Sequence, residues 1–260
     1  MPARPLIVFS SPSTEAVLQQ HGLGSLDQIF QNQAEAHVRH NGRAVWKTEL
    51  RGADGSTFAA FVKLGWGRRR WWPRVSDIHA RQVFKSLAVR EWEGLAVFDQ
   101  LGLRVPERMA ILEEGLLWKR SALILRAVPP PASLSDMILD GSWLRLPLED
   151  RQSILEEVVR TLRHIHKSGW AWRSISTRHF FPQRSTRGVW DLWLIDCEGV
   201  HRARSTEILH RDFRRFLRAL AHDRADEQTL EMMRKIGSQL AFPGISHEQV
   251  SRSKPARPAA

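Results

Sequence analysis

The sequence contains no tyrosine and only one cysteine, Cys197, in 260 residues. A lone cysteine excludes an internal disulfide and is typical of a protein in a reducing compartment. Every run of apolar residues falls well short of the roughly 18 that a membrane-spanning helix needs. The apolar start Leu6–Phe9 is too short for the core of a signal peptide. We therefore expect a cytoplasmic protein without a membrane span.

Positive charge is in clear excess, with 39 Lys and Arg against 28 Asp and Glu and a formal net charge of +11. Of the basic residues, 32 are arginines, whose planar guanidinium suits phosphate. This excess indicates nucleic acid, anionic lipid headgroups or a phosphorylated substrate as partner, although a GC-rich genome predicts the same composition. No nucleic acid is expected, because the chain has no zinc-ligand spacing, helix-turn-helix pattern or aromatic sheet motif.

The order of segments predicts an α+β protein of two lobes, with strands first and mainly helices later. The expected strands are 44–50, 58–64, 108–112, 121–126 and 189–196, the first two joined through the turn pair Asp54-Gly55. The expected helices are 87–101, 149–168 and 207–221. The expected parts are an N-terminal extension (1–39), a first lobe (40–128) with a basic, Trp-rich insert (66–85), a second lobe (129–250) and a disordered tail (251–260). The proline run at 129–131 is expected at the hinge.

Two charged residues lie where apolar ones are expected. Lys63 shares its strand face with Phe61, and Glu91 shares its helix stripe with Leu95. A buried lysine and a buried carboxylate are each costly alone, and pairing reduces the cost. We therefore predict a Lys63–Glu91 ion pair inside the first lobe. The alternative is that both side chains reach water at the edges of their elements.

A third charged residue, Asp196, is the last residue of an expected apolar strand and shares a face with Leu192 and Leu194. A carboxylate at a strand end is a natural Mg²⁺ ligand, because hard cations prefer carboxylate oxygen. A turn-capping aspartate is the alternative. Because Asp196 comes after Lys63 and Glu91 in the chain, we favour the Mg²⁺ ligand over the turn cap.

This order of parts resembles the protein kinases and, more narrowly, the lipopolysaccharide kinase family (the Kdo/WaaP and InaA group). The resemblance covers roughly residues 40–222. The residues that carry it are Phe61-Val62-Lys63, Gly65-Trp66-Gly67, Arg90-Glu91-Trp92, Leu101 to Pro106, His164 to Trp170, Arg178 to Phe181 and Leu194-Ile195-Asp196.

The resemblance implies a bilobal protein-kinase-like fold, with a small antiparallel-sheet N-lobe carrying one main helix and a mostly helical C-lobe. It also implies ATP and Mg²⁺ as cofactors. Lys63, steadied by Glu91, then holds the ATP phosphates, and Asp196 binds Mg²⁺. His179 corresponds to the second metal ligand.

The catalytic triplet departs from the family pattern. Trp172-Arg173-Ser174 stands where the family has a His-Arg-Asp-like sequence, so Ser174 occupies the position of the catalytic base. A serine hydroxyl cannot accept the substrate proton as a carboxylate does, and such a base contributes about 10²–10⁴-fold. His210-Arg211-Asp212 resembles the missing triplet but comes after Asp196 and within a helix. Asp212 therefore resembles the aspartate that anchors the catalytic loop.

The family resemblance implies an ATP-dependent kinase that phosphorylates a heptose or Kdo sugar of the lipopolysaccharide inner core. The alternative is a catalytically impaired, pseudokinase-like nucleotide-binding regulator of envelope or stress responses. The basic insert predicts a substrate or membrane patch that contacts acidic sugars or the anionic inner face of the inner membrane. A solvated loop or a nucleic-acid groove are the other interpretations. The patch residues are Trp66, Arg68, Arg69, Arg70, Trp71 and Trp72.

Overall fold

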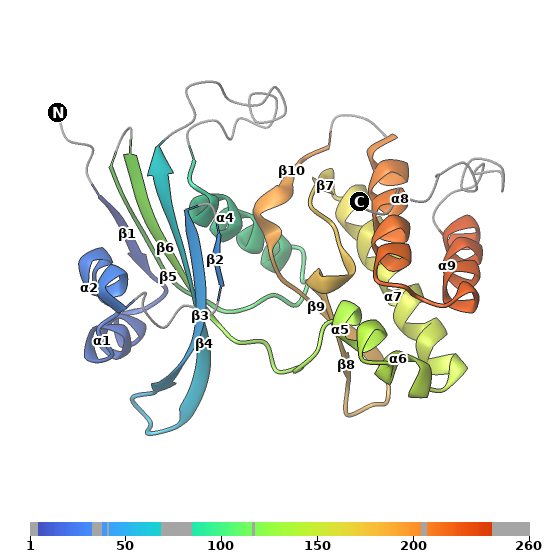
Figure 1. Ribbon diagram of the computed structural model, residues 1–260, viewed down its shortest axis with the longest axis horizontal. Helices are drawn as coiled ribbons and strands as arrows, with labels where there is room; N and C mark the ends of the chain where they lie inside the picture. Colours follow the sequence, from blue (N-terminus) through green and yellow to red (C-terminus); the bar gives the residue numbers. More distant parts are fainter. Residues whose placement is uncertain are drawn as a thin grey trace, which may run out of the picture. The chain divides into compact units, whose positions relative to one another are not determined.

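The computed structural model describes residues 5–32, 38–40, 42–68, 85–115, 118–203 and 207–240. The chain divides into two compact units (Figure 1). The first contains Met1–Pro129 and Leu194–His201, and the second contains Pro130–Trp193 and Arg202–Ala260. The division therefore falls within the proline run. The segment Leu194–His201 belongs to the first unit although the residues on both sides of it belong to the second, so Asp196 is part of the first unit. The tail 251–260 lies outside the described residues.

The first unit is built on an antiparallel sheet of six strands, in the order β1-β5-β6-β4-β3-β2. The strands are β1 (Leu6–Phe9), β2 (Val38–His40), β3 (Arg43–Arg51), β4 (Thr57–Arg68), β5 (Arg108–Glu114) and β6 (Trp118–Arg126). The predicted turn joins β3 to β4: Gly55 has φ 80°, and Asp54 accepts a hydrogen bond from the Ser56 amide. Lys63 pairs with Val45 on one side and Leu123 on the other, so it lies inside the sheet.

Helices cover both faces of this sheet (Figure 1). On one side, α1 (Pro12–Gln20) and α2 (Leu26–Gln31) bury Leu18 and Ile29 in a core with Val62 and Leu64 of β4. On the other side lies α4 (Leu87–Gln100), which starts at Ser86 and buries Leu95 and Phe98. Because side chains alternate along a strand, Lys63 points away from the Val62 face.

Residues expected to form an N-terminal extension (1–39) thus contribute strands and helices to the first unit. The apolar start Leu6–Phe9 is strand β1, which pairs with β5 at the edge of the sheet. Local sequence cannot identify a four-residue strand whose partner lies about a hundred residues away.

The second unit is mainly helical, as predicted. Its helices are α5 (Leu134–Leu139), α6 (Ser142–Arg145), α7 (Leu148–Lys167), α8 (Glu207–His222) and α9 (Glu227–Leu240), with the 3-10 turn η2 (Thr177–His179). Short strands are β7 (Trp170–Trp172), β8 (Phe180–Arg184) and β9 (Trp190–Leu194), and the returning segment holds η3 (Cys197–Gly199) and β10 (Val200–Arg202). The apolar stripe of α7 is buried from Ile154 to Ile165, which confirms the predicted periodicity. Among the described residues, no helix is both long and apolar enough to cross a membrane.

Candidate functional site

The predicted ion pair is present in the first unit. Lys63 Nζ lies 2.6 Å from Glu91 Oε1, and the Glu91 side chain is only 6% exposed. Burial disfavours the charged form of Lys63, but Glu91 and Asp196 outweigh burial and raise its pKa. The raised pKa favours the charged form of Lys63 at this point of the sheet, and a positively charged donor is suited to binding phosphate oxygens.

Asp196 reaches this ion pair by a route that differs from the prediction. Strand β9 ends at Leu194, so strand alternation does not orient Asp196. Instead Asp196 adopts φ 58° and ψ 53°, a left-handed conformation that is uncommon for a residue other than glycine. Such strain persists where the surroundings enforce it and is typical of functional sites. The negative charge of Asp196 contributes to the raised pKa of Lys63.

The residue after Asp196 is packed tightly under α4. Cys197 is fully buried, and burial together with Glu91 and Asp196 raises the pKa of its thiol, so the thiol stays neutral. At Gly94 of α4 an added Cβ atom would lie 2.1 Å from the Cys197 carbonyl oxygen. The backbone contact between α4 and Cys197 therefore requires glycine at position 94, a signal that the sequence alone did not reveal.

Glu198 adds a second carboxylate to the same segment. Burial raises the pKa of Glu198, the nearby charge of Asp196 raises it further, and Arg43 opposes both. The Arg43 Nη1 to Glu198 Oε2 distance is 3.8 Å. Arg43 is a site neighbour that sequence reasoning missed, because its partner is far away in the sequence.

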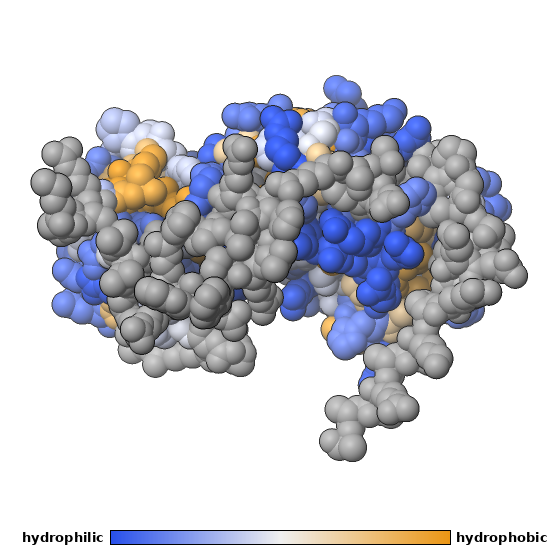
Figure 2. Space-filling model, turned by 90° about the horizontal axis from the view of Figure 1, so that it is seen from above, coloured by the Kyte–Doolittle hydropathy of each residue, from blue (hydrophilic) through white to orange (hydrophobic). Residues whose placement is uncertain are grey.

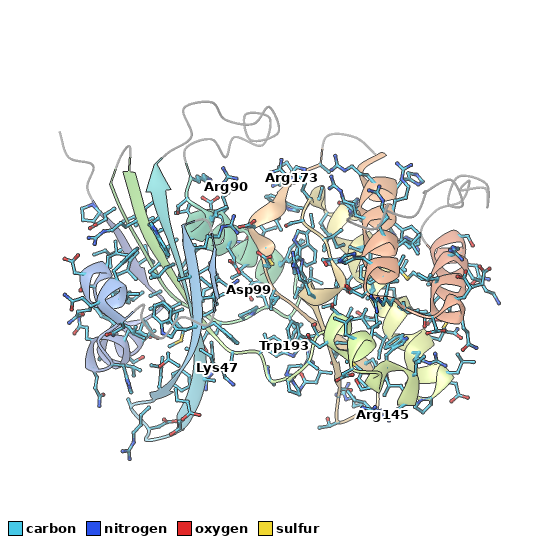
Figure 3. The ribbon with its side chains drawn as sticks, in the orientation of Figure 1. Lys47, Arg90, Asp99, Arg145, Arg173 and Trp193 are labelled. Carbon is cyan, nitrogen blue, oxygen red and sulfur yellow. The ribbon has the colours of Figure 1, made fainter. Side chains whose placement is uncertain are left out.

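The second unit contains the Trp172-Arg173-Ser174 segment, which was predicted to correspond to the catalytic loop. The backbone amide of Trp172 donates to Asp212 Oδ2 at 3.2 Å, and Arg215 Nη1 donates to the Arg173 carbonyl at 2.8 Å. Asp212 is fully buried on α8. This arrangement confirms that Asp212 is an anchor of the loop. Arg173 lies at the end of β7 near α8 (Figure 3).

Ser174 and His179 both lie in this part of the second unit. The Ser174 Oγ atom is buried and has no hydrogen-bond partner among the described residues. His179 is 2% exposed and stacks on Trp172, with ring centroids 5.7 Å apart. The Nε2 atom of His179 accepts a hydrogen bond from Arg178 Nε at 3.3 Å. The pairing of His179 with Asp196 across the two units stays a prediction.

The residues of the first unit fit the implied Mg²⁺ in their chemistry. Asp196 offers carboxylate oxygen, the ligand that Mg²⁺ prefers, and Glu198 is a second carboxylate nearby. His179 could use Nε2 as a ligand only if its bond from Arg178 were broken. In the described part of the chain, no group of three or more His, Cys, Asp or Glu side chains forms a metal site by itself.

Of the predicted basic, Trp-rich patch, the side chain of Trp66 lies in the described part of the chain. Strand β4 continues through Arg68, and Trp66 is partly buried against the core of the first unit, edge-on to Phe30 at 6.0 Å. Strand alternation turns Trp66 toward the α1–α2 side. The side chain of Arg68 and residues Arg69, Arg70, Trp71 and Trp72 lie outside the described residues.

Comparison with known proteins agrees with this geometry. Residues 27–235 match the lipopolysaccharide kinase (Kdo/WaaP) family. No curated protein matches the chain. Among solved structures, the chain is similar to WaaP in complex with acyl carrier protein, with a TM-score of 0.61 and 16% identity over 89% of this chain and 88% of that chain. This similarity confirms the predicted protein-kinase-like fold.

Proposed function

Because the chain belongs to the lipopolysaccharide kinase (Kdo/WaaP) family, we propose that it is an ATP-dependent kinase that phosphorylates a heptose or Kdo sugar of the lipopolysaccharide inner core. One observation carries the ATP-dependent part of this proposal. Lys63 is held 2.6 Å from the buried Glu91, and the Asp196 carboxylate acts on the same ammonium group. A fixed cation beside a carboxylate is what binding of a metal-bound triphosphate requires.

In this proposal Lys63 contacts the ATP phosphates, and Glu91 fixes the position of its ammonium group. Asp196 holds Mg²⁺, which when bound neutralises charge on the phosphates. The left-handed backbone at Asp196 and the contact of Gly94 with Cys197 fix where that carboxylate points. Catalysis then rests mainly on positioning and electrostatics, as is typical of phosphoryl transfer.

On the acceptor side, Ser174 occupies the position of the family's base, with Arg173 before it and His179 after it. The serine hydroxyl cannot act as a carboxylate base, which reduces the rate by about 10²–10⁴-fold unless another group accepts the proton. Glu198 is the candidate acceptor in the first unit, because its raised pKa makes it a stronger base than an ordinary glutamate.

Ser174 also favours a second function. A chain that binds nucleotide through Lys63, Glu91 and Asp196 but lacks a base is suited to nucleotide-dependent regulation. In that case the protein is a pseudokinase-like regulator of envelope or stress responses. The two functions share the nucleotide site and differ only in whether phosphate is transferred.

The proposed place of action is the cytoplasm, at the anionic inner face of the inner membrane, where the inner-core glycolipid is accessible. The net charge of +11 supports contact with such a surface. The structurally similar WaaP was solved with acyl carrier protein, which is therefore a partner to test for this chain.

The experiment has two stages. Calorimetric titration with ATP and Mg²⁺ measures nucleotide binding, and transfer of the labelled γ-phosphate to core oligosaccharide measures activity. Binding with transfer supports the kinase. Binding without transfer selects the regulator, and absence of nucleotide binding contradicts both.

A further inference from the structure

Four arginines of the second unit gather beside the loop after β7, and we call them the arginine cluster: Arg173, Arg211, Arg215 and Arg218. The last three follow one another at spacings of four and three residues along α8, so they share one face of the helix. Arg215 Nη1 donates to the Arg173 carbonyl at 2.8 Å, which connects this face to the loop. Figure 2 shows mainly hydrophilic residues where this face of the second unit is not covered by grey atoms.

Two members of the arginine cluster share one carboxylate. Asp212 Oδ1 lies 3.5 Å from Arg215 Nη1 and 3.6 Å from Arg211 Nε. Asp212 also accepts from the Trp172 amide and lies 3.3 Å from His166 Nε2. One carboxylate with these other neighbours therefore faces the guanidinium groups of Arg211 and Arg215.

Two further observations indicate a missing anion. The Nε and Nη2 atoms of Arg211 are buried and have no hydrogen-bond partner among the described residues. Burial lowers the pKa of Arg215, and the like charges of Arg211, Arg218 and Arg173 lower it further against the opposing Asp212. Buried donors without acceptors and repelling cations are both costly, and an anion relieves both costs.

We propose that the arginine cluster binds a phosphate group that the acceptor already carries. Arginine forks bind phosphate through two parallel hydrogen bonds, and several of them in one place match its multiple oxygens and double charge. This inference rests on the proposed kinase function and adds a specificity rule to it. In this proposal the enzyme recognises its acceptor by a phosphate that the acceptor already carries.

The first test measures anion binding alone. The double variant Arg211→Gln/Arg218→Gln removes two members of the cluster and keeps Arg215, which holds the Arg173 carbonyl. The control is Arg234→Gln, which removes an arginine whose guanidinium is paired with Glu227 and Glu231. All proteins carry Lys63→Met, so that the probe does not bind at the nucleotide site.

The probe is inorganic phosphate, titrated at constant ionic strength against chloride, with the melting temperature as readout. We expect phosphate to stabilise the parent and the Arg234→Gln control, because a ligand that binds the native state raises its stability. We expect the shift to fall at least three-fold in the double variant. Equal shifts in all three proteins, or no shift in the parent, overturn the proposal.

The second test decides whether the phosphate belongs to the acceptor or is free in solution. Transfer from ATP is measured with the core acceptor before and after phosphatase treatment, using the cluster variants with Lys63 intact. We expect the double variant to raise KM for the phosphorylated acceptor about ten-fold, at an unchanged KM for ATP, and to have no effect with the treated acceptor. An unchanged acceptor KM, despite weakened phosphate binding, overturns the acceptor assignment.

Failure of the proposed function is recognised separately. If the parent transfers no phosphate, the kinase proposal fails. The melting experiment with inorganic phosphate still decides whether the arginine cluster binds an anion.

Discussion

Gly94→Ala is expected to disrupt the nucleotide site through a single methyl group. The new Cβ atom would lie 2.1 Å from the Cys197 carbonyl oxygen and 2.9 Å from its carbon, below the 3.0 Å that real contacts respect. In an unobstructed helix the same substitution stabilises by about 0.5–1 kcal/mol. Here the obstacle is backbone rather than a flexible side chain, so either α4 or the Cys197 segment must move.

The magnitude follows from two opposing contributions. Overpacking costs about 1–3 kcal/mol, and the gain in helix propensity of about 0.5–1 kcal/mol offsets part of it, leaving a net loss of up to about 2.5 kcal/mol. Because Cys197 follows Asp196 directly, the displacement also moves the Asp196 carboxylate relative to Lys63. A loss of about 1.4 kcal/mol in binding is ten-fold in affinity, so we expect MgATP to bind at least ten-fold more weakly.

The control is Gly237→Ala in α9, where the added Cβ atom would lie 2.1 Å from the Phe213 ring. This overlap has the same size but lies in the second unit. Both variants are unfolded with urea and titrated with MgATP. We expect both to lose stability and only Gly94→Ala to lose nucleotide affinity. Unchanged MgATP binding by Gly94→Ala, or equal losses in both variants, would refute the reasoning.

The remaining predictions concern three other positions. Glu91→Gln removes the carboxylate paired with Lys63 and leaves Asp196 to compensate its charge. The variant should lose about 2 kcal/mol in urea unfolding, less than the roughly 3–5 kcal/mol of a fully buried pair, and should bind MgATP more weakly. Ser174→Asp should raise single-turnover transfer from ATP, because it supplies a carboxylate base worth up to about 10²–10⁴-fold. Burial opposes the charge of Asp226, but hydrogen bonds from the Thr229 amide and hydroxyl outweigh it and lower the pKa of Asp226. Asp226→Asn should therefore cost about 1 kcal/mol at neutral pH, the difference between a hydrogen bond to a charged acceptor and one to a neutral acceptor.

The Glu91 and Ser174 predictions each have a control variant and a result that would contradict them. For Glu91 the matched control is Glu93→Gln, on the same helix and 2.6 Å from Lys85 but exposed to solvent, and equal losses in both would contradict the buried-pair account. If Ser174→Ala abolishes transfer, the hydroxyl itself takes part. If Ser174→Asp lowers transfer, the added charge repels the γ-phosphate and the chain uses another acceptor.

The lowered pKa of Asp226 determines the direction in which its contribution to stability changes with pH. Its contribution to stability is complete above pH 3.8, the ordinary pKa, and is lost as the pH falls through the lower folded pKa. The difference between parent and Asp226→Asn should therefore shrink at acidic pH. A constant difference from pH 7 to pH 2 would show that the charge is not involved.

Local patterns were sufficient to predict much of the first unit. Alternation in β4 and the helical stripe of α4 placed Lys63 and Glu91 on facing surfaces, and the structure joins them at 2.6 Å. The pair was predictable because each charge interrupts a regular apolar pattern. The anchor role of Asp212 was predictable for a related reason, since its helix has a clear apolar face.

Features that depend on distant contacts were not predictable in this way. Strand periodicity placed Asp196 in a strand, whereas the chain leaves the strand at Leu194 and turns left-handed. Trp66 was expected in an exposed patch because it begins a basic run, but β4 continues and turns it onto Phe30. The need for glycine at position 94 arises from Cys197, about a hundred residues later, and no local pattern encodes it.

The central claim is tested most directly by transfer of the ATP γ-phosphate to core oligosaccharide under single-turnover conditions. The parent is compared with Lys63→Met and with Lys85→Met, whose lysine forms an equally short ion pair at an exposed site. The account predicts transfer by the parent and by Lys85→Met, and a loss of at least about a hundred-fold in Lys63→Met, because Lys63 contacts the phosphates. Transfer by Lys63→Met at the parent rate would contradict it.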